Sequence, residues 1–258
     1  MARSAKEVFP LENLCKLLFE LSSSERMNVL LELQKQRLKL SQISKKLNMT
    51  VTEASRHLQR LSEAKLIQKD VDGSYGLTHF GTLTLSLLSG LNFVSENRQY
   101  FLEHEISYLP SEFIGRIGEL SASSLGTRDI MTGFRLAEIM LQEASEYIWI
   151  LSDQVLTSGV PIIGEKMKSG LEFRFIFPEN LVPPPGVKPV PGTQRRTLSR
   201  VEEIILMTDK EAWFGCPDLN GKIDYVLFLS KDLISHKWCR DLFLYRWEQA
   251  KPALSPVK

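Results

Sequence analysis

The sequence predicts two domains, a small α+β unit on the N-terminal side and a larger α/β domain with a mixed sheet. Three observations lead to this fold class. Residues 40–77 carry two short helical patterns and a hairpin pattern, and positive charge is concentrated in the same stretch. The second half of the chain alternates helical periods with short apolar runs. A chain of 258 residues with 43% hydrophobic content can bury a core in each domain.

The N-terminal side begins with three helical patterns. Residues 8–21, from Val8 to Leu21, place apolar residues at helical spacing, and residues 22–25 (Ser-Ser-Ser-Glu) have the form of a capping box that opens a second helix. Residues 41–47 form a third, short helix with Ile43 and Leu47 on its inner face. Asn48 and Met49 then make a turn.

A fourth helix follows this turn and has two distinct faces. Thr50 and Glu53 have the spacing of a capping box at its start. An apolar stripe predicts the buried face and a polar stripe predicts the exposed one. His57 lies at the edge of the apolar stripe, as a packing residue or a phosphate contact. The apolar stripe is Val51, Ala54, Leu58 and Leu61, and the polar stripe is Thr52, Ser55, Arg56 and Gln59.

A hairpin pattern comes directly after the fourth helix. Residues 66–71 are strand-like, Asp72-Gly73 is a turn dipeptide, and residues 74–77 return. Thr78 can cap a leucine-rich helix over 79–94, which serves either as core or as a surface that pairs with its copy in a dimer. Two helices, a tight turn and a hairpin are the elements of a winged helix-turn-helix.

Charge agrees with a nucleic-acid partner. Residues 34–69 contain nine Lys/Arg and two acidic residues, a balance of +7, against +1 for the whole chain. Arg and Gln on the polar stripe can bond guanine and adenine edges, and a Thr methyl can pack on thymine. The alternative is a three-helix unit with a solvated charged face, used for protein–protein contacts. The residues predicted to contact double-stranded DNA are Lys45, Lys46, Thr50, Thr52, Ser55, Arg56, Gln59, Arg60, Lys69 and Tyr75.

Domain limits and compartment follow from composition. Residues 1–95 carry +4 and the remainder carries −3. We expect a DNA-binding domain over 1–95, a helical linker over 96–126, and an α/β domain over 127–258.

Three widely spaced cysteines without a CxxC pair indicate a reducing cytoplasm and no zinc site. The N-terminus has no signal-peptide pattern and no apolar run has the length of a membrane span, so we expect a soluble cytoplasmic protein without membrane contact.

The second half predicts the elements of the α/β domain. A helix over 128–145, a buried strand over 147–151, a helix over 162–168 and a strand over 171–177 imply a parallel strand pair. A proline-rich loop over 178–191 is followed by strands over 204–207, 212–214 and 225–229, which are antiparallel in character. The elements before and after these are a helix over 111–120, a flexible joint over 121–126, and a last helix over 234–250.

Five segments of the chain carry a resemblance to a known family, namely residues 100–110, 113–120, 149–154, 221–225 and 238–247. Together they resemble the predicted methanogenesis-regulatory transcription factors of archaea. In that family an ArsR-like or MarR-like winged helix-turn-helix precedes a middle domain first described in a methanogen filamentation regulator. The resemblance implies a DNA-binding, dimeric regulator whose second domain senses a small molecule. Similarity to sugar-sensing archaeal regulators implies a phospholipase-D-like topology for that domain; the resemblance supplies no ligand.

Catalysis has little support. Phospholipase-D-type chemistry needs a histidine with a lysine two positions on, whereas His236 and Lys237 are adjacent. Cys216 and Cys239 could form a redox pair, although cysteines near tryptophan are more often core. The glycines form no phosphate-binding loop. We therefore expect no enzyme activity, no cofactor and no metal.

A small-molecule effector is expected at the carboxyl ends of the parallel strands. Ser152, Asp153 and Gln154 follow the first strand, and residues 179–180 follow the second. Trp149 or Trp213 could supply an aromatic wall, and Arg174, Arg195, Arg196 or Arg200 could meet an anion. The alternatives are Trp149 as a core residue, which is the more common role of a tryptophan in a buried strand, Asp153 as a helix cap, and Arg195-Arg196 as part of a solvated loop. The preferred ligand residues are Trp149, Ser152, Asp153, Gln154, Arg174, Arg200 and Trp213.

These expectations combine into a sequence-specific transcriptional regulator. A homodimer would place two recognition helices ~34 Å apart in successive major grooves. An effector or a partner bound to the α/β domain would change the spacing or mobility of the two DNA-binding heads. The alternative is a DNA-bound adaptor whose C-terminal domain binds a protein.

Overall fold

The computed structural model describes residues 11–185, 187 and 191–253. The chain divides into two compact units, Met1–Leu88 and Ser89–Lys258, and each has its own core. The first unit, called the head below, contains the predicted winged helix-turn-helix, and the second is the α/β domain.

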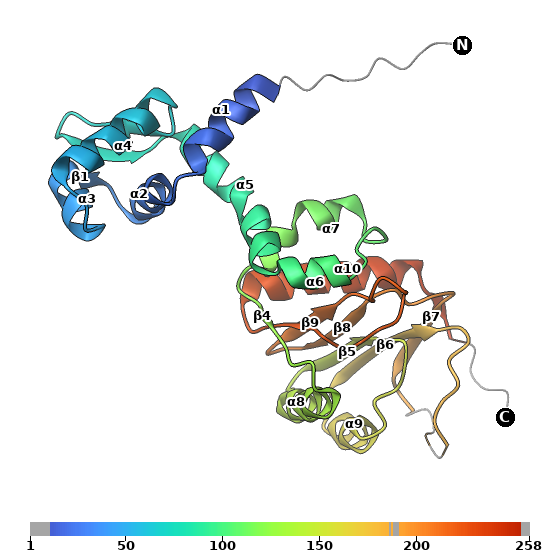
Figure 1. Cartoon of the computed structure of the whole chain (residues 1–258). Helices are drawn as coiled ribbons and strands as arrows, with labels where there is room; N and C mark the ends of the chain where they lie inside the picture. Colours follow the sequence, from blue (N-terminus) through green and yellow to red (C-terminus); the bar gives the residue numbers. More distant parts are fainter. Residues whose placement is uncertain (1–10, 186, 188–190, 254–258) are drawn as a thin grey trace, which may run out of the picture. The chain divides into compact units, whose positions relative to one another are not determined.

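The first unit consists of helices α1 to α4, the first part of α5 and a small sheet (Figure 1). Its three strands are antiparallel in the order β1-β3-β2, so the central strand comes last in sequence. Val8, the first residue of the expected opening helix, lies outside the described residues. The elements are α1 Leu11–Leu21, α2 Ser24–Lys35, β1 Leu38–Lys39, α3 Leu40–Lys46, α4 Val51–Glu63, β2 Ile67–Lys69 and β3 Ser74–Leu77, followed by α5 His79–Glu96.

The core of the first unit confirms most of the predicted helix faces. Ile43 of α3 and Ala54, Leu58 and Leu61 of α4 are buried together. Val51 is the exception, because its side chain is 55% exposed at the first position of α4. A first-turn position has no preceding helical turn to cover it, so the predicted apolar stripe begins one turn later.

The second unit contains one eight-stranded mixed sheet in the order β11-β7-β6-β5-β8-β9-β10-β4. The predicted parallel pair is present as β5 and β6, and β7 adds a second parallel pairing. The β8–β9 hairpin is antiparallel, also as predicted. The strands are β4 Ser124–Leu125, β5 Tyr147–Leu151, β6 Glu172–Pro178, β7 Gln194–Leu198, β8 Ile204–Thr208, β9 Ala212–Gly215, β10 Phe228–Ser230 and β11 Lys251–Pro252.

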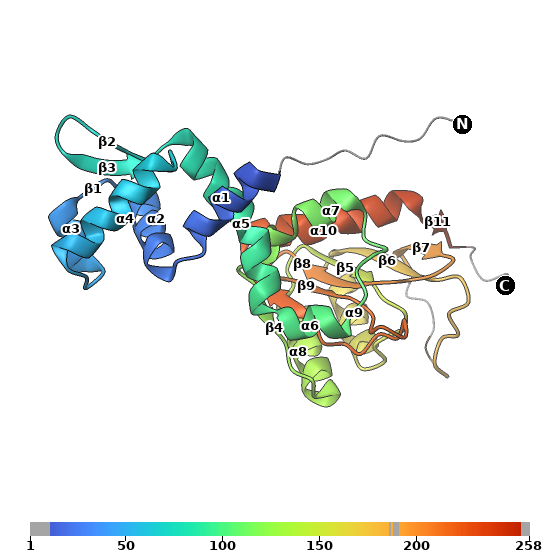
Figure 2. The same ribbon diagram turned by 45° about the horizontal axis from the view of Figure 1, so that its top comes forward.

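Helices cover both faces of this sheet. Helices α8 and α9 lie against one face, and α10 lies against the other together with α6 and α7 (Figures 1 and 2). Alternate residues of each central strand therefore enter two different cores; Ile148 packs towards α8 and α9, and Trp149 packs towards α10. The helices are α6 Arg98–Glu103, α7 Ser111–Gly115, the 3-10 helix η1 Ile117–Leu120, α8 Ile130–Glu143, α9 Gly159–Lys168 and α10 Leu233–Gln249.

Residues 96–126 are part of the second unit, which corrects the expected linker and the boundary at residue 95. Tyr100, Phe113 and Leu120 are buried in the same core as α10. The expected flexible joint over 121–126 contains β4, which pairs with β10 at the sheet edge.

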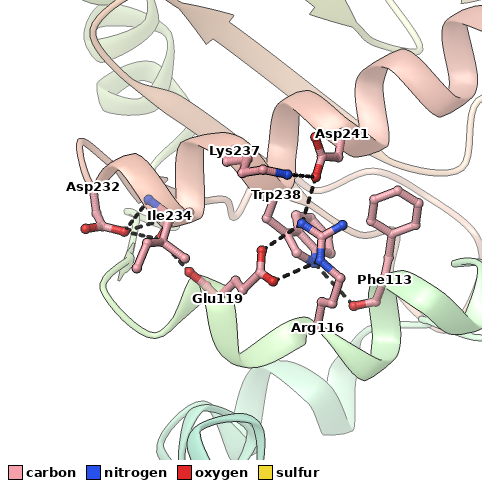
Figure 3. A network of polar contacts seen from close by, with 9 residues as sticks. Phe113, Arg116, Glu119, Asp232, Ile234, Lys237, Trp238 and Asp241 are labelled. Carbon is pink, nitrogen blue, oxygen red and sulfur yellow. Dashed lines mark hydrogen bonds and ion pairs between the residues drawn. The ribbon is translucent and has the colours of Figure 1, made fainter. Parts of the chain in front are cut away.

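Polar contacts also hold this segment to α10 (Figure 3). Arg116 donates to both Glu119 and Asp241, with distances of 2.7 to 2.8 Å. The indole Nε1 of Trp238 donates to the carbonyl oxygen of Phe113 at 3.2 Å. The bonds from Arg116 to Asp241 and from Trp238 to Phe113 join positions more than one hundred residues apart, so no local sequence pattern predicts them.

Two strands differ from expectation. Strand β7 was not predicted, because its sequence Gln-Arg-Arg-Thr-Leu lacks an apolar alternation. The strand expected over 225–229 is reduced to β10, and Tyr225 instead adopts a positive φ of 62°. Among the described helices, none is both long and apolar enough to cross a membrane.

Candidate nucleic-acid interface and ligand cavity

The turn between α3 and α4 is built by local hydrogen bonds. Asn48 takes a φ of 51°, which asparagine tolerates better than most residues. The hydroxyl of Ser44 donates to the carbonyl oxygen of Met49 at 2.7 Å. Thr50 Oγ1 accepts from the amide of Glu53, and the Glu53 carboxylate accepts from the amide of Thr50 at 2.8 Å. The predicted capping box is thus present and fixes the start of α4.

The four residues of the polar stripe on α4 are all exposed. In the described structure, Arg56 forms no ion pair, so its guanidinium is available to a base or a phosphate. Gln59 donates to Glu63 at 2.9 Å, one turn further along the same helix. Because that contact is exposed, it costs little to break. The stripe therefore offers donors and acceptors on one side of a helix whose other side is buried.

His57 is a packing residue. It is 9% exposed, and its Nδ1 atom is buried without a hydrogen-bond partner among the described residues. Burial lowers the pKa of His57 below the ordinary value, and the nearby Arg56 charge lowers it further. A neutral, buried imidazole does not suit a phosphate contact, which decides between the two predicted roles.

The predicted basic contacts differ in their surroundings. Lys45 is exposed and forms no ion pair within the described part of the chain. Lys46 is paired with Glu32 of α2 at 2.5 Å. Arg60 is paired with Glu20 of α1 and lies over the Phe19 ring, so it is held inside the head. Of the three, Lys45 is the one most accessible to a phosphate.

The wing is a tight hairpin. Gly73 has a φ of 83°, and Asp72 Oδ1 accepts from both the amide and the hydroxyl of Ser74. The ammonium of Lys69 lies 5.6 Å from the centroid of the Tyr75 ring, so the two predicted wing contacts touch each other. The hairpin thus presents one cation and one aromatic ring on the same strand pair.

A cavity of about 480 Å³ lies in the second unit, between the sheet and the layer formed by α8 and α9. Its walls are mainly apolar, with Phe134 and Leu141 of α8, Phe175 of β6 and Leu206 of β8 among them. Its size lies within the range of small-molecule pockets. Arg195 of β7 is the single charged residue among those that line it.

The predicted ligand residues are divided between the two faces of the sheet. Ser152, Gln154 and Trp213 line the cavity. Asp153 lies beside it and accepts a hydrogen bond of 2.6 Å from the hydroxyl of Tyr225, which does line it. Strand alternation separates these residues from Trp149 and Arg174, which point to the other face of the sheet.

Trp149, Arg174 and Arg200 do not line the cavity. Trp149 and Arg174 are register partners on β5 and β6 and face α10, where the Arg174 guanidinium lies 4.5 Å from the Trp149 ring centroid. Arg200 is exposed and is paired with Glu202. Adjacent strand positions point to opposite faces, so Arg195 rather than Arg174 reaches the cavity.

The histidine and the two cysteines considered for catalysis are engaged in contacts or buried in the second unit. His236 Nε2 lies 3.1 Å from the Tyr147 hydroxyl and 2.7 Å from the carbonyl oxygen of Thr208. Cys216 and Cys239 are both buried, and burial raises the pKa of the Cys216 thiol to about 12. A thiol with so high a pKa is a poor nucleophile. The described residues contain no cluster of three potential metal ligands.

Comparisons with known proteins agree with the geometry of the head. Residues 23–69 match the family model of the bacterial regulatory proteins of the arsR family. This range spans α2, α3, α4 and the first strand of the wing. No curated protein shows significant similarity to the chain.

One similar solved structure is that of TrmBL2, an archaeal chromatin protein described as having a novel mode of DNA binding. It shares 15% sequence identity at a TM-score of 0.44, over 84% of this chain and 88% of that chain. At this TM-score the similarity supports no conclusion about function. Of the two winged-helix types expected, the family match supports the ArsR type. Residues 23–69 therefore form an ArsR-type helix-turn-helix, and this match supports a DNA-binding regulator, in agreement with the exposed polar stripe of α4.

Proposed function

We propose that the chain is a sequence-specific transcriptional regulator that acts as a homodimer and responds to a small molecule bound in its second unit. The observation that carries the proposal is the two-sided character of α4. Its polar stripe is exposed while Ala54, Leu58 and Leu61 are buried on the other side. A helix held in this way can enter a major groove without losing the contacts that hold the head together.

Within the groove, the residues of α4 have separate tasks. Arg56 can donate two hydrogen bonds to a guanine edge, and the methyl group of Thr52 can pack on thymine. Lys45, on the preceding helix, binds a phosphate and supplies affinity without sequence choice. The wing brings Lys69 and Tyr75 to the adjacent backbone.

The homodimer is supported by an apolar stripe on α5. Leu83, Leu87 and Leu91 are 58%, 71% and 63% exposed. They follow at intervals of four residues, with Phe80 and Val94 extending the same stripe at three-residue steps. Such spacing places these side chains along one side of a helix, where a second copy of the helix can bury them. A two-fold pairing would present two α4 helices to successive major grooves.

The effector is assigned to the cavity of the second unit. A predominantly apolar cavity with few polar groups is the usual form of a small-molecule site. An adaptor that binds a protein would instead need an open apolar surface. Effector binding would favour one arrangement of the two heads over another, and DNA affinity would change accordingly.

The test is selection of duplexes from a randomised pool by the purified full chain, with sequencing of the bound fraction. We expect enrichment of a site with two related half-sites. Arg56→Ala should lose the preference at one position of each half-site. Arg135→Ala is the matched control, because Arg135 is an exposed arginine on α8 in the other unit. A bound fraction with no sequence preference would contradict the proposal.

A further inference from the structure

We infer that the cavity of the second unit binds an extended apolar chain that ends in a single anionic group, with Arg195 as the anion ligand. This inference rests on the proposed function, because it names the chemical class of the effector. It is argued from the shape of the cavity, the composition of its walls and the position of its one charge.

The cavity extends across much of the sheet. Residues from β7, β6, β5, β8, β9 and β10 line it, and these strands are consecutive in the sheet. Five intervals of ~4.8 Å between neighbouring strands correspond to a span of roughly 24 Å. A cavity lined over this span suits an extended ligand better than a compact one.

The walls do not suit a sugar. Each hydroxyl group of a polyol needs a hydrogen-bonding partner when it leaves water. The polar groups at the β5 end are already engaged with one another, since the Tyr225 hydroxyl donates to Asp153 and contacts the Gln154 amide. The Ser152 hydroxyl accepts from the amide of Gln154. Thr157 and Ser158 also line the cavity, but most of its lining residues are apolar, so an apolar chain finds more contacts there than a polyol finds hydrogen-bond partners.

Arg195 is the one charged residue among those that line the cavity. Within the described residues its side chain forms no ion pair. It is the register partner of Phe175, which lines the cavity from β6, so both face α8 and α9. Its neighbour Arg196 points to the other face, where it donates to the carbonyl oxygen of Trp247 at 2.5 Å. A half-buried cation in an apolar wall is stabilised by a bound anion.

The charges also orient the ligand. Asp153 lies beside the cavity at the Tyr225 end, and its carboxylate repels an anion there. Arg195 lies on β7, towards the opposite side of the sheet. The anionic group therefore binds at β7, and the chain extends along the sheet towards β10.

The probe is dodecanoate, with dodecanol as its neutral counterpart and maltose as a polyol, each below any micelle-forming concentration. Binding to the full chain, freed of bound amphiphiles on a hydrophobic resin, is measured by titration calorimetry without DNA. Dodecanoate should bind more tightly than dodecanol, and maltose should not bind. Arg195→Gln should weaken dodecanoate roughly ten- to a hundredfold, the range of a charge-assisted hydrogen bond, and leave dodecanol unchanged. Arg135→Gln, the same change on an arginine outside the cavity, should have no effect.

A second pair of variants tests the position of the chain. Gly133 of α8 lines the cavity, and a Cβ added there would meet no other atom within 4 Å. Gly133→Leu should therefore fold and weaken both dodecanoate and dodecanol. Gly164→Leu on α9 is the matched control, because its added Cβ is equally free and it does not line the cavity.

The inference is overturned if no amphiphile binds, if dodecanol binds as tightly as dodecanoate, or if Arg195→Gln behaves like Arg135→Gln. It is also overturned if maltose is the ligand, or if Gly133→Leu binds like Gly164→Leu. Duplex selection by the same proteins without amphiphile reports on the DNA proposal separately. If the chain binds dodecanoate but shows no selective DNA binding, only the regulator proposal is contradicted. If it binds DNA selectively but does not bind dodecanoate, only the proposed ligand class is contradicted.

Discussion

Arg60 on α4 and Glu20 on α1 form a two-pronged ion pair. Arg60 Nη2 lies 2.5 Å from Glu20 Oε1, and Arg60 Nε lies 3.1 Å from Glu20 Oε2. The same guanidinium lies 5.2 Å from the centroid of the Phe19 ring. Arg60 thus ties the recognition helix to the first helix, although its place beside Gln59 suggested a DNA contact.

Arg60→Gln should loosen α1 and change DNA affinity less than Arg56→Gln does. We expect several-fold faster hydrogen exchange in peptides from α1 and α4, measured by mass spectrometry at neutral pH. The hydrogen bond from Arg60 lowers the pKa of Glu20 below its usual value of 4.5. The ionised Glu20 carboxylate therefore contributes its full stabilisation of the folded head above pH 4.5, and this stabilisation is lost as the pH falls through the lowered pKa. The difference in hydrogen-exchange rate between the variant and the wild type should therefore vanish in acid. A difference in exchange rate that does not depend on pH would contradict this role of the Arg60–Glu20 pair.

Arg56 and Lys45 should separate sequence choice from general affinity. Arg56→Ala should cost ~1–3 kcal/mol at the preferred site and relax the choice at one base pair. Lys45→Ala should weaken preferred and random duplexes alike and reduce the salt dependence by about one counterion. Fluorescence anisotropy with both duplexes over a salt series measures the two effects.

The two variants control each other. Each removes one exposed cation from the helix-turn-helix without touching the buried side of α4. Equal losses on preferred and random duplexes for Arg56→Ala would show that α4 does not read bases through this side chain.

Local signals in the sequence predicted the head well. The capping box at Thr50, the turn at Asn48 and the turn dipeptide at Gly73 depend on residues within four positions of each other. The placement of residues 96–126 could not be predicted in this way. Tyr100 and Phe113 are buried against elements more than one hundred residues away, and only the folded chain brings them together. The phospholipase-D-like topology stays a prediction.

The residues of the candidate ligand site were predicted only in part, because both faces of the sheet are covered by helices. Alternation shows that Trp149 and Ile150 face opposite sides, but both sides are covered by helices and both are apolar. The sequence therefore contains no sign of which side holds a cavity. Arg195 was one of four candidate anion ligands and was not preferred, because its strand has no apolar pattern.

Arg174 should prove to be a packing residue rather than a ligand. Its guanidinium lies 4.5 Å from the Trp149 ring centroid and 5.5 Å from that of Trp247. Arg174→Gln removes both cation–π contacts and should destabilise the second unit by about 1–2 kcal/mol. All four tryptophans lie in this unit, so urea unfolding followed by tryptophan fluorescence reports on it alone.

Dodecanoate affinity is the second measurement on this variant, and it should not change in Arg174→Gln. If Arg174→Gln lost dodecanoate binding without losing stability, Arg174 would be a ligand-binding residue and not a packing residue. Arg135→Gln again serves as the control for charge, since Arg135 is exposed and contacts neither tryptophan.

Leu87→Lys should convert a dimer into a monomer. Leu87 is 71% exposed at the centre of the α5 stripe, and a lysine there would place like charges opposite each other in a two-fold pairing. Because a monomer binds one half-site only, affinity for the full site should fall by roughly a hundredfold or more. Sedimentation velocity and anisotropy measure the two effects. Leu233→Lys is the control, a leucine that is 85% exposed at the start of α10; a monomeric wild type would rule out the α5 pairing.

The pair between Glu203 and Arg246 is the most deeply buried ion pair described in the chain, and its loss should be costly. Arg246 Nε lies 2.5 Å from Glu203 Oε1, and the Glu203 side chain is 2% exposed. Burial raises the pKa of Glu203, and the Arg246 charge opposes that shift. The Arg246 charge therefore favours the ionised carboxylate, against the effect of burial. Glu203→Leu would leave the guanidinium without a counter-charge and should cost about 3–5 kcal/mol.

The double variant decides whether this cost comes from the pair or from the unpaired charge. Glu203→Leu with Arg246→Met replaces both charges by apolar groups of similar size and should recover most of the lost stability. For a unit of this size the single variant should lower the unfolding midpoint by on the order of 10 °C. Calorimetry of the three proteins tests this. If the double variant is no more stable than Glu203→Leu, the hydrogen bond from Arg246 to the carbonyl oxygen of Tyr108 matters more than the charge it carries.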